Sequence, residues 1–158
     1  MTTDRPKDPS VAIDASGTVP ALLSATAHAL VHALDAAACT ISRAIGDLLV
    51  DLVDYSPAGP VQIGHGYLIS DYPTTREVLE ELDSRRVSVA DPASDEREVA
   101  LLRELGFDAL LMLALVRDGG AWGLVEVYDG RERFSDDDVA IATRIVERAS
   151  SALARLRD

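Results

Sequence analysis

Two apolar segments joined by a glycine turn constrain the fold more than any other feature of this sequence. Residues 108–116 read Asp-Ala-Leu-Leu-Met-Leu-Ala-Leu-Val, an almost unbroken apolar run. A strand of that composition is covered on both faces, which places it in the middle of a layered sheet. The Arg-Asp-Gly-Gly sequence at 117–120 has the chemistry of a tight turn, so residues 121–128 can return beside the first segment. We therefore expect a central antiparallel hairpin.

The apolar periodicity of the remaining chain predicts further strands and helices around this hairpin. Residues 1–18 are polar and lack an apolar period, so we expect a flexible tail there and one domain over 19–158. The expected helices are 19–36, 73–85 and 95–105, together with a closing helix that follows Ser135. The expected additional strands are 37–43, 47–55, a short strand at 67–70, and 86–90.

The closing helix has the clearest boundary signals in the chain. Ser135 is a candidate N-cap, Asp138 stands three residues later, and Phe134 and Val139 can form a hydrophobic staple. On a helical wheel its apolar residues cover an arc of about 160°, wider than one contact with a sheet needs. The surplus predicts a second partner, most simply another helix. We expect a homodimer interface here, formed by Ala142, Ile145, Ala149, Leu153 and Leu156.

Charge and composition exclude several classes of function. The 158 residues include 27 acidic and 15 basic side chains, a formal charge of −12, which disfavours binding to nucleic acid or to anionic lipid. The sequence lacks a run of about 18 uncharged apolar residues, so we expect no membrane span. It also lacks a positively charged start that leads into an apolar stretch, so we expect no signal peptide. A single cysteine, Cys39, is typical of a reducing compartment, so we expect a cytoplasmic location.

Several stretches resemble a known family. They are the apolar strand from Gly106, the Gly-Gly turn, the return strand Trp-Gly-Leu-Val-Glu-Val-Tyr at 122–128, and Phe-Ser-Asp-Asp-Asp at 134–138. Together with Tyr72-Pro73, Arg76 and Val89-Ala90-Asp91, they resemble bacterial GAF domains over about residues 20–156. A PAS domain is the main alternative, because it shares an antiparallel sheet. It usually lacks a long capped helix directly after the hairpin.

The resemblance implies an α/β (α+β) fold with a central antiparallel sheet of five or six strands. The terminal helices would lie on one face, and the crossover helices and loops would form a ligand cavity on the other. Glu126 is a carboxylate in an otherwise apolar central strand, where it can contact a ligand or pair with Arg43 or Arg76. An ordinary ion pair or an exposed edge position is the alternative. The expected ligand-binding residues are Tyr67, Tyr72, Arg76, Val89, Met112 and Glu126.

The motifs of ligand-specific GAF subfamilies are largely missing. Phe134 and Asp138 match part of the cyclic-nucleotide signature of phosphodiesterases, but Val139 replaces its glutamate and no Asn-Lys pair precedes it. Cys39 lies too early to resemble the cysteine that carries a bilin, so we interpret it as a small core residue. A single thiol also argues against the methionine sulfoxide reductases of the family, whose cycle needs a resolving cysteine.

The histidines and acidic pairs give no metal or catalytic motif. His28 and His32 stand four residues apart, but we expect both to face away from the apolar stripe of the first helix, so we expect no metal site. His65 would be the one candidate for an axial haem ligand. No nucleophile and base are suitably spaced, so we expect no enzyme activity.

Two functions remain for a chain of this kind. The first is a non-catalytic sensory module that binds a small molecule, whose identity stays open, and signals through its terminal helices. The alternative is a ligand-free dimerisation or protein-interaction module. The expected partners are a second copy of the chain and a signalling protein such as a kinase or a diguanylate cyclase.

Overall fold

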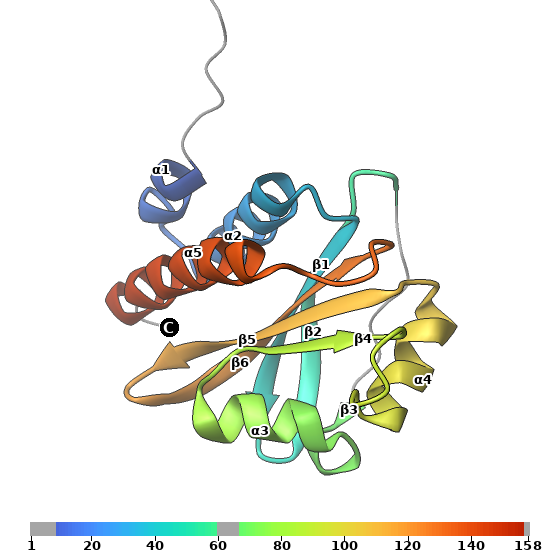
Figure 1. Ribbon diagram of the computed structural model, residues 1–158. Helices are drawn as coiled ribbons and strands as arrows, with labels where there is room; N and C mark the ends of the chain where they lie inside the picture. Colours follow the sequence, from blue (N-terminus) through green and yellow to red (C-terminus); the bar gives the residue numbers. More distant parts are fainter. Residues whose placement is uncertain (1–8, 60–66, 157–158) are drawn as a thin grey trace, which may run out of the picture.

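A six-stranded antiparallel sheet forms the middle of the protein, with helices on both faces (Figure 1). The computed structural model describes residues 9–59 and 67–156. The strand order is β3-β2-β1-β6-β5-β4. The strands are β1 (Ala38–Ile45), β2 (Leu48–Tyr55), β3 (Tyr67–Leu68), β4 (Arg85–Ser88), β5 (Ala109–Arg117) and β6 (Gly120–Asp129). The helices are α1 (Pro9–Asp14), α2 (Val19–Leu34), the short 3-10 helix η1 (Ile69–Asp71), α3 (Pro73–Glu81), α4 (Glu96–Leu105) and α5 (Asp136–Arg155).

The central hairpin predicted from the sequence is confirmed. β5 pairs antiparallel with β6, with Leu113 opposite Val125 and Arg117 opposite Gly120. Asp118 and Gly119 form the turn, and both have positive φ angles, 54° and 79°. Two consecutive positive φ angles give a turn whose twist matches that of the flanking strands.

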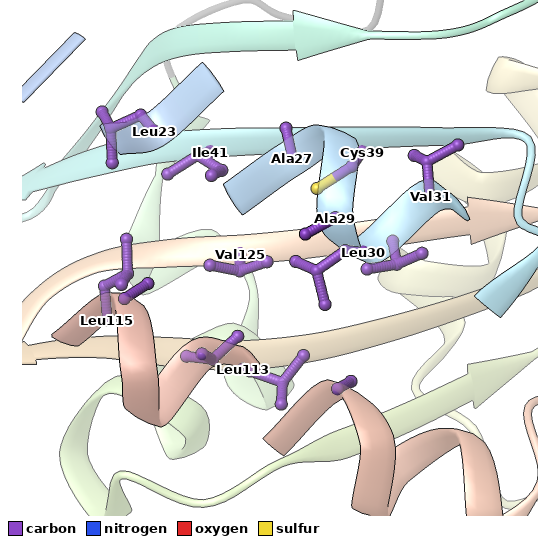
Figure 2. Packing of buried hydrophobic residues seen from close by; sticks show 14 of the residues in the cluster. Leu23, Ala27, Ala29, Leu30, Val31, Cys39, Ile41, Leu113, Leu115 and Val125 are labelled. Carbon is purple, nitrogen blue, oxygen red and sulfur yellow. The ribbon is translucent and has the colours of Figure 1, made fainter. Parts of the chain in front are cut away.

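The terminal helices α2 and α5 lie side by side on one face of the sheet (Figure 1), as the family resemblance implies. Their contact with the sheet is a close-packed aliphatic core. Figure 2 shows Leu30 of α2 next to Val125 of β6, with Leu113 and Leu115 of β5 close to α5. All four side chains are buried. We call this side of the sheet the helix face.

The start of α5 has the predicted capping box. The Oγ of Ser135 accepts a hydrogen bond from the backbone N–H of Asp138 at 3.1 Å, and an Asp138 carboxylate oxygen accepts one from the N–H of Ser135 at 2.9 Å. Arg131 ties this end of α5 to its neighbours. Its guanidinium donates to Asp129, to Asp138 and to the carbonyl oxygens of Leu34 and Asp35, which end α2.

Part of the expected N-terminal tail is helical. α1 packs on α2 and α5, and Ile13 is only 1% exposed. Asp14 forms an ion pair with Arg148 of α5 at 2.6 Å. A six-residue helix with one buried side chain has no apolar period that could be detected in the sequence, which explains the correction over residues 9–14. Residues 1–8 lie outside the described residues.

The broad apolar arc of α5 is used within the protein itself. Ala142, Ala149 and Leu153 have no exposed surface, and Ile145 and Leu156 are half-buried against the same core. Besides β5, the helix contacts α2 and α1. The helical partner that the arc predicts is therefore supplied by the chain's own N-terminal helices. The homodimer interface expected at these residues stays a prediction.

Other boundaries differ by a few residues from those expected. α3 ends at Glu81 instead of 85, because Leu82 adopts a left-handed backbone with φ of 57°. The short strand expected at 67–70 covers two residues and continues as η1. Within the described residues no helix has the length and apolar character needed to cross a bilayer.

Candidate functional site

The face of the sheet opposite α2 and α5 carries the candidate site, and we call it the pocket face. A second apolar cluster covers it, in which Val78 of α3 and Leu102 of α4 pack towards Leu110 and Met112 of β5 and Leu124 of β6. The sheet is therefore covered by helices on both sides. Unlike the helix face, this side also holds several polar groups.

Glu126 lies at the centre of the pocket face. It sits on β6 between Thr40 of β1 and Met112 of β5, and it is 8% exposed. The Tyr128 hydroxyl donates a hydrogen bond to one carboxylate oxygen at 2.8 Å, and the other oxygen has no hydrogen bond from the described residues. Burial, followed by the negative charge of Glu98, raises the pKa of Glu126 to about 8.

Glu98 is a second buried carboxylate, and α4 positions it. Asp95 caps α4 by accepting hydrogen bonds from the first backbone N–H groups, including that of Glu98. The Glu98 side chain is 2% exposed and accepts a hydrogen bond of 2.6 Å from the Thr75 hydroxyl of α3. That hydroxyl also lies 3.6 Å from the sulfur of Met112. Burial raises the pKa of Glu98, although the hydrogen bond from Thr75 opposes the shift.

A β-bulge brings two further carboxylates to the pocket face. Residues three apart in a regular strand point to opposite faces, but the register of β1 with β2 shifts so that Leu52 has no partner. Asp54 therefore stands opposite Thr40 and Asp51 opposite Ser42, on the same side as Glu126. Burial, together with a hydrogen bond and repulsion from Asp54, raises the pKa of Asp51. One Asp51 oxygen is buried and has no hydrogen bond within the described part of the chain.

Two tyrosines come from the segment between β2 and α3. Tyr67 lies on β3 and Tyr72 precedes α3, and their rings meet edge to face with centroids 5.8 Å apart. Both are half-buried. Burial, then the negative charge of Glu126, raises the pKa of Tyr67 to about 12. Burial and the charge of Glu98 also raise the pKa of Tyr72. These tyrosines therefore border the acidic groups.

Most of the residues expected to bind a ligand lie on or beside the pocket face. Glu126 and Met112 are neighbours across β6 and β5, and Tyr67 and Val89 pack against the same apolar cluster. Arg76 is the exception, because its exposed side chain pairs with Glu80 along α3 at 3.9 Å. It does not neutralise Glu126.

The other expected partner of Glu126, Arg43, points to the helix face. Its guanidinium carbon lies 4.4 Å from the centre of the Trp122 ring. The alternation of β6 predicts Trp122 on the same side as Glu126, yet it packs in the helix-face core. A second register shift, in the pairing of β5 with β6, leaves Trp122 without a partner and explains the change of face.

Sequence reasoning missed Glu98 and the aspartates of β2. Glu98 could have been found, because it stands four and seven residues before Leu102 and Leu105, on the inner stripe of α4. Asp51 and Asp54 gave no comparable signal, since a bulge within an apolar-polar strand has no distinctive sequence here.

The cysteine and the histidines lie away from the pocket face. Cys39 is fully buried in the helix-face core, where burial raises the pKa of its thiol. This confirms its interpretation as a core residue. His28 stacks on Tyr55 with ring centroids 3.7 Å apart, and His32 Nε2 lies 3.0 Å from the Tyr55 hydroxyl. Among the described residues no three His, Cys, Asp or Glu side chains group as a metal site. His65 falls outside those residues.

Once its acids are ionised, the site accepts hydrogen bonds and positive charge, whereas below its pKa of about 8 Glu126 holds a proton. Four carboxylates share the pocket face, and two of them, on Glu98 and Glu126, are buried. Neither arginine expected to pair with Glu126 does so. A group that brings N–H donors or a positive charge would relieve the repulsion among these carboxylates.

Comparisons with known proteins agree with this architecture. The fold is similar to the chromophore-binding domain of a Stigmatella aurantiaca bacteriophytochrome, with a TM-score of 0.80 at 16% identity, over 94% of this chain and 58% of that one. The chromophore-binding domain of a bacteriophytochrome from R. palustris is similar too, with a TM-score of 0.80 at 13% identity and the same two coverages. The chain thus spans less than two thirds of these structures. No curated protein matches by sequence. The family model of the GAF domain matches residues 18–153, and the chain belongs to that family.

Proposed function

We propose that this chain is a non-catalytic sensory module that binds a small molecule over the pocket face, beneath α3 and α4. The observation that carries the proposal is Glu126, a buried residue on a central strand whose second carboxylate oxygen receives no hydrogen bond from the described residues. A group of this kind destabilises the folded protein unless something compensates it. Without a ligand, Glu126 is compensated by keeping its proton, since its pKa is about 8. A ligand that brings a positive charge or N–H donors would compensate the ionised form instead.

The polar groups of the pocket face favour one kind of ligand. Glu98, Glu126, Asp51 and Asp54 offer only acceptors when ionised, so they select N–H donors or a cationic nitrogen. Anionic ligands such as cyclic nucleotides are disfavoured by the same repulsion. Tyr67 and Tyr72 would add flat apolar contacts beside these acids.

The similar bacteriophytochrome domains bind a chromophore, and this supports a ligand for the present chain. Attachment through Cys39 is not part of the proposal, because that thiol is buried on the opposite face. We propose reversible, non-covalent binding.

The proposed signal leaves through the terminal helices. β6, which carries Glu126, leads through Arg131 into the start of α5, and the same guanidinium holds the end of α2. A ligand that moved β6 would therefore move both helices together. We propose as receivers a second copy of the chain, or a signalling partner such as a kinase or a diguanylate cyclase. The cytoplasm is the proposed location, since Cys39 is a free thiol.

Thermal shift measurements test the binding proposal. The wild-type chain is heated with a panel of amines, guanidines, purines, cyclic nucleotides and tetrapyrroles, in parallel with E126Q and with E147Q, an exposed acid on α5. We expect at least one cationic or N–H-rich compound to raise the Tm of wild type and of E147Q, and to raise that of E126Q much less. Stabilisation by anionic compounds alone, or by none of the panel, would contradict the proposal.

A further inference from the structure

An apolar row crosses the sheet at the end where β1 turns into β2. Ile45 of β1 stands opposite Leu48 of β2, and Leu48 stands opposite Leu68 of β3. The three side chains share the helix face, because Ile45 lies four residues after Ile41 in the regular alternation of β1. They are 58%, 42% and 50% exposed. Neither α2 nor α5 therefore covers this end of the helix face.

Beside this row lies an arginine that no acidic side chain of the described residues pairs with. Arg43 is also on β1, two residues before Ile45, and it rests on the Trp122 ring. No described residue accepts a hydrogen bond from its guanidinium, and its Nε is buried without a partner. The Trp122 Nε1 is buried without an acceptor too. Most arginines near the sheet, such as Arg85 and Arg131, are paired with carboxylates.

We propose that Ile45, Leu48, Leu68 and Arg43 form a docking surface for a short acidic and apolar segment of a partner protein. Apolar side chains of the segment cover the three aliphatic residues, and a carboxylate of the segment pairs with the Arg43 guanidinium. Charge complementarity supports this occupant. A half-buried cation at the border of an exposed apolar row lacks its counter-ion, and an acidic residue supplies it.

Size and charge argue against two other occupants. Three half-exposed aliphatic side chains and an arginine offer much less area than the roughly 800 Å² that each partner buries in a standard interface. A second copy would also bring another charge of −12. The same negative charge disfavours an anionic membrane surface. A short segment needs only a small contact area and does not bring the large negative charge of a second copy or of an anionic membrane.

A random peptide library provides the test, because the chain has its own reporter. Trp122 is the only tryptophan and lies under Arg43, so its fluorescence responds to a contact there. Twelve-residue peptides without tryptophan are selected on the full chain, and the enriched peptides are synthesised and titrated by Trp122 fluorescence. We expect the enriched peptides to carry acidic residues between apolar ones. We expect I45D or R43Q to weaken binding by about tenfold or more, as central interface residues do.

Matched variants distinguish binding at this docking surface from nonspecific binding. V11D changes an equally exposed apolar residue on α1, and R144Q removes an exposed arginine on α5, so neither should change the affinity. Selection on R43E should yield basic peptides instead of acidic ones. Circular dichroism establishes that each variant is folded. The proposal is overturned if no peptide is enriched, if basic peptides are enriched on wild type, or if I45D binds the enriched peptides as well as V11D does.

Discussion

The two faces of the sheet are built from the same strands but differ in chemistry. On β6, Val125 and Val127 point to the helix face and are fully buried among aliphatic side chains, whereas Glu126 between them points to the pocket face. The helix face contains no buried carboxylate among the described residues, and the pocket face contains Glu98 and Glu126. The alternation of side chains along β6 therefore places apolar groups that stabilise the fold on one face, and a buried polar group that lowers its stability on the other.

This difference supports the proposal that the pocket face carries the function. Apolar packing against α2 and α5 is what a small domain needs to stay folded. Buried acids without counter-ions lower stability, so their presence indicates a role other than folding. If this interpretation is right, substitutions on the helix face destabilise the protein, and neutral replacements on the pocket face stabilise it.

The largest effect is expected for A149E on the helix face. Ala149 has no exposed surface and lies where α5 packs in the core, so the new carboxylate would be buried without a partner. We expect a loss of at least about 4 kcal/mol in the free energy of unfolding, enough to leave much of the protein unfolded. Urea denaturation followed by circular dichroism measures it. A well-folded monomer would instead mean that this part of α5 is a surface between copies.

The next effect is a pH dependence of stability that comes from Glu126. Its pKa is about 8 in the folded protein against an ordinary value of 4.5, so between these pH values the folded state holds a proton that the unfolded state has lost. Stability therefore falls as pH rises through this window, and E126Q removes that fall. Between pH 5 and 7.5 we expect wild type to lose about 3 kcal/mol relative to E126Q.

Urea denaturation of both proteins at a series of pH values measures this difference. E147Q is the control, since Glu147 is exposed and its replacement should leave the slope unchanged. If the free energy of unfolding changed with pH in the same way for wild type and E126Q, the Glu126 carboxylate would be compensated in the isolated protein. The contrast between the two faces would then lose its main support.

A smaller loss of stability is expected for G123A, which changes the spacing of β1 and β6 and so affects both faces of the sheet. Gly123 of β6 stands opposite Arg43, and a Cβ at this position would collide with the backbone oxygen of Ser42. G123A must therefore push β1 away from β6. We expect a loss of about 2 kcal/mol, within the usual range for overpacking. G130A is the control, since its added Cβ meets no atom within 4 Å. Equal stability of the two variants would contradict the close approach.

The sequence allowed the fold to be predicted well because its strongest signals are local. The run at 108–116, the Asp-Gly turn and the Ser135 cap each act within a few residues, and all were confirmed. α1 was missed because a helix of six residues shows one buried side chain, Ile13. The use of the α5 arc by α2 and α1 is a long-range contact that no local pattern contains.

The candidate site was predicted less completely, because bulges decide which residues face it. Strict alternation along β6 placed Trp122 beside Glu126, and one register shift moved it to the other face. Another shift on β2 brought Asp51 and Asp54 together. Glu126 itself was identified, since a carboxylate in a central apolar strand stands out without any knowledge of register.

The smallest expected effect is S135A, which separates local helix capping from the packing of the helix face. The Ser135 hydroxyl accepts one hydrogen bond at the exposed start of α5, and the carboxylate of Asp138 keeps the reciprocal bond when the hydroxyl is removed. We expect a loss of about 1 kcal/mol. S135D, which keeps an acceptor at the cap, should lose less, although it adds a charge beside Asp136–Asp138. If S135A cost as much as A149E, the stability of the helix face would depend on how α5 begins as much as on its buried side chains. The contrast between the two faces would then need a different explanation.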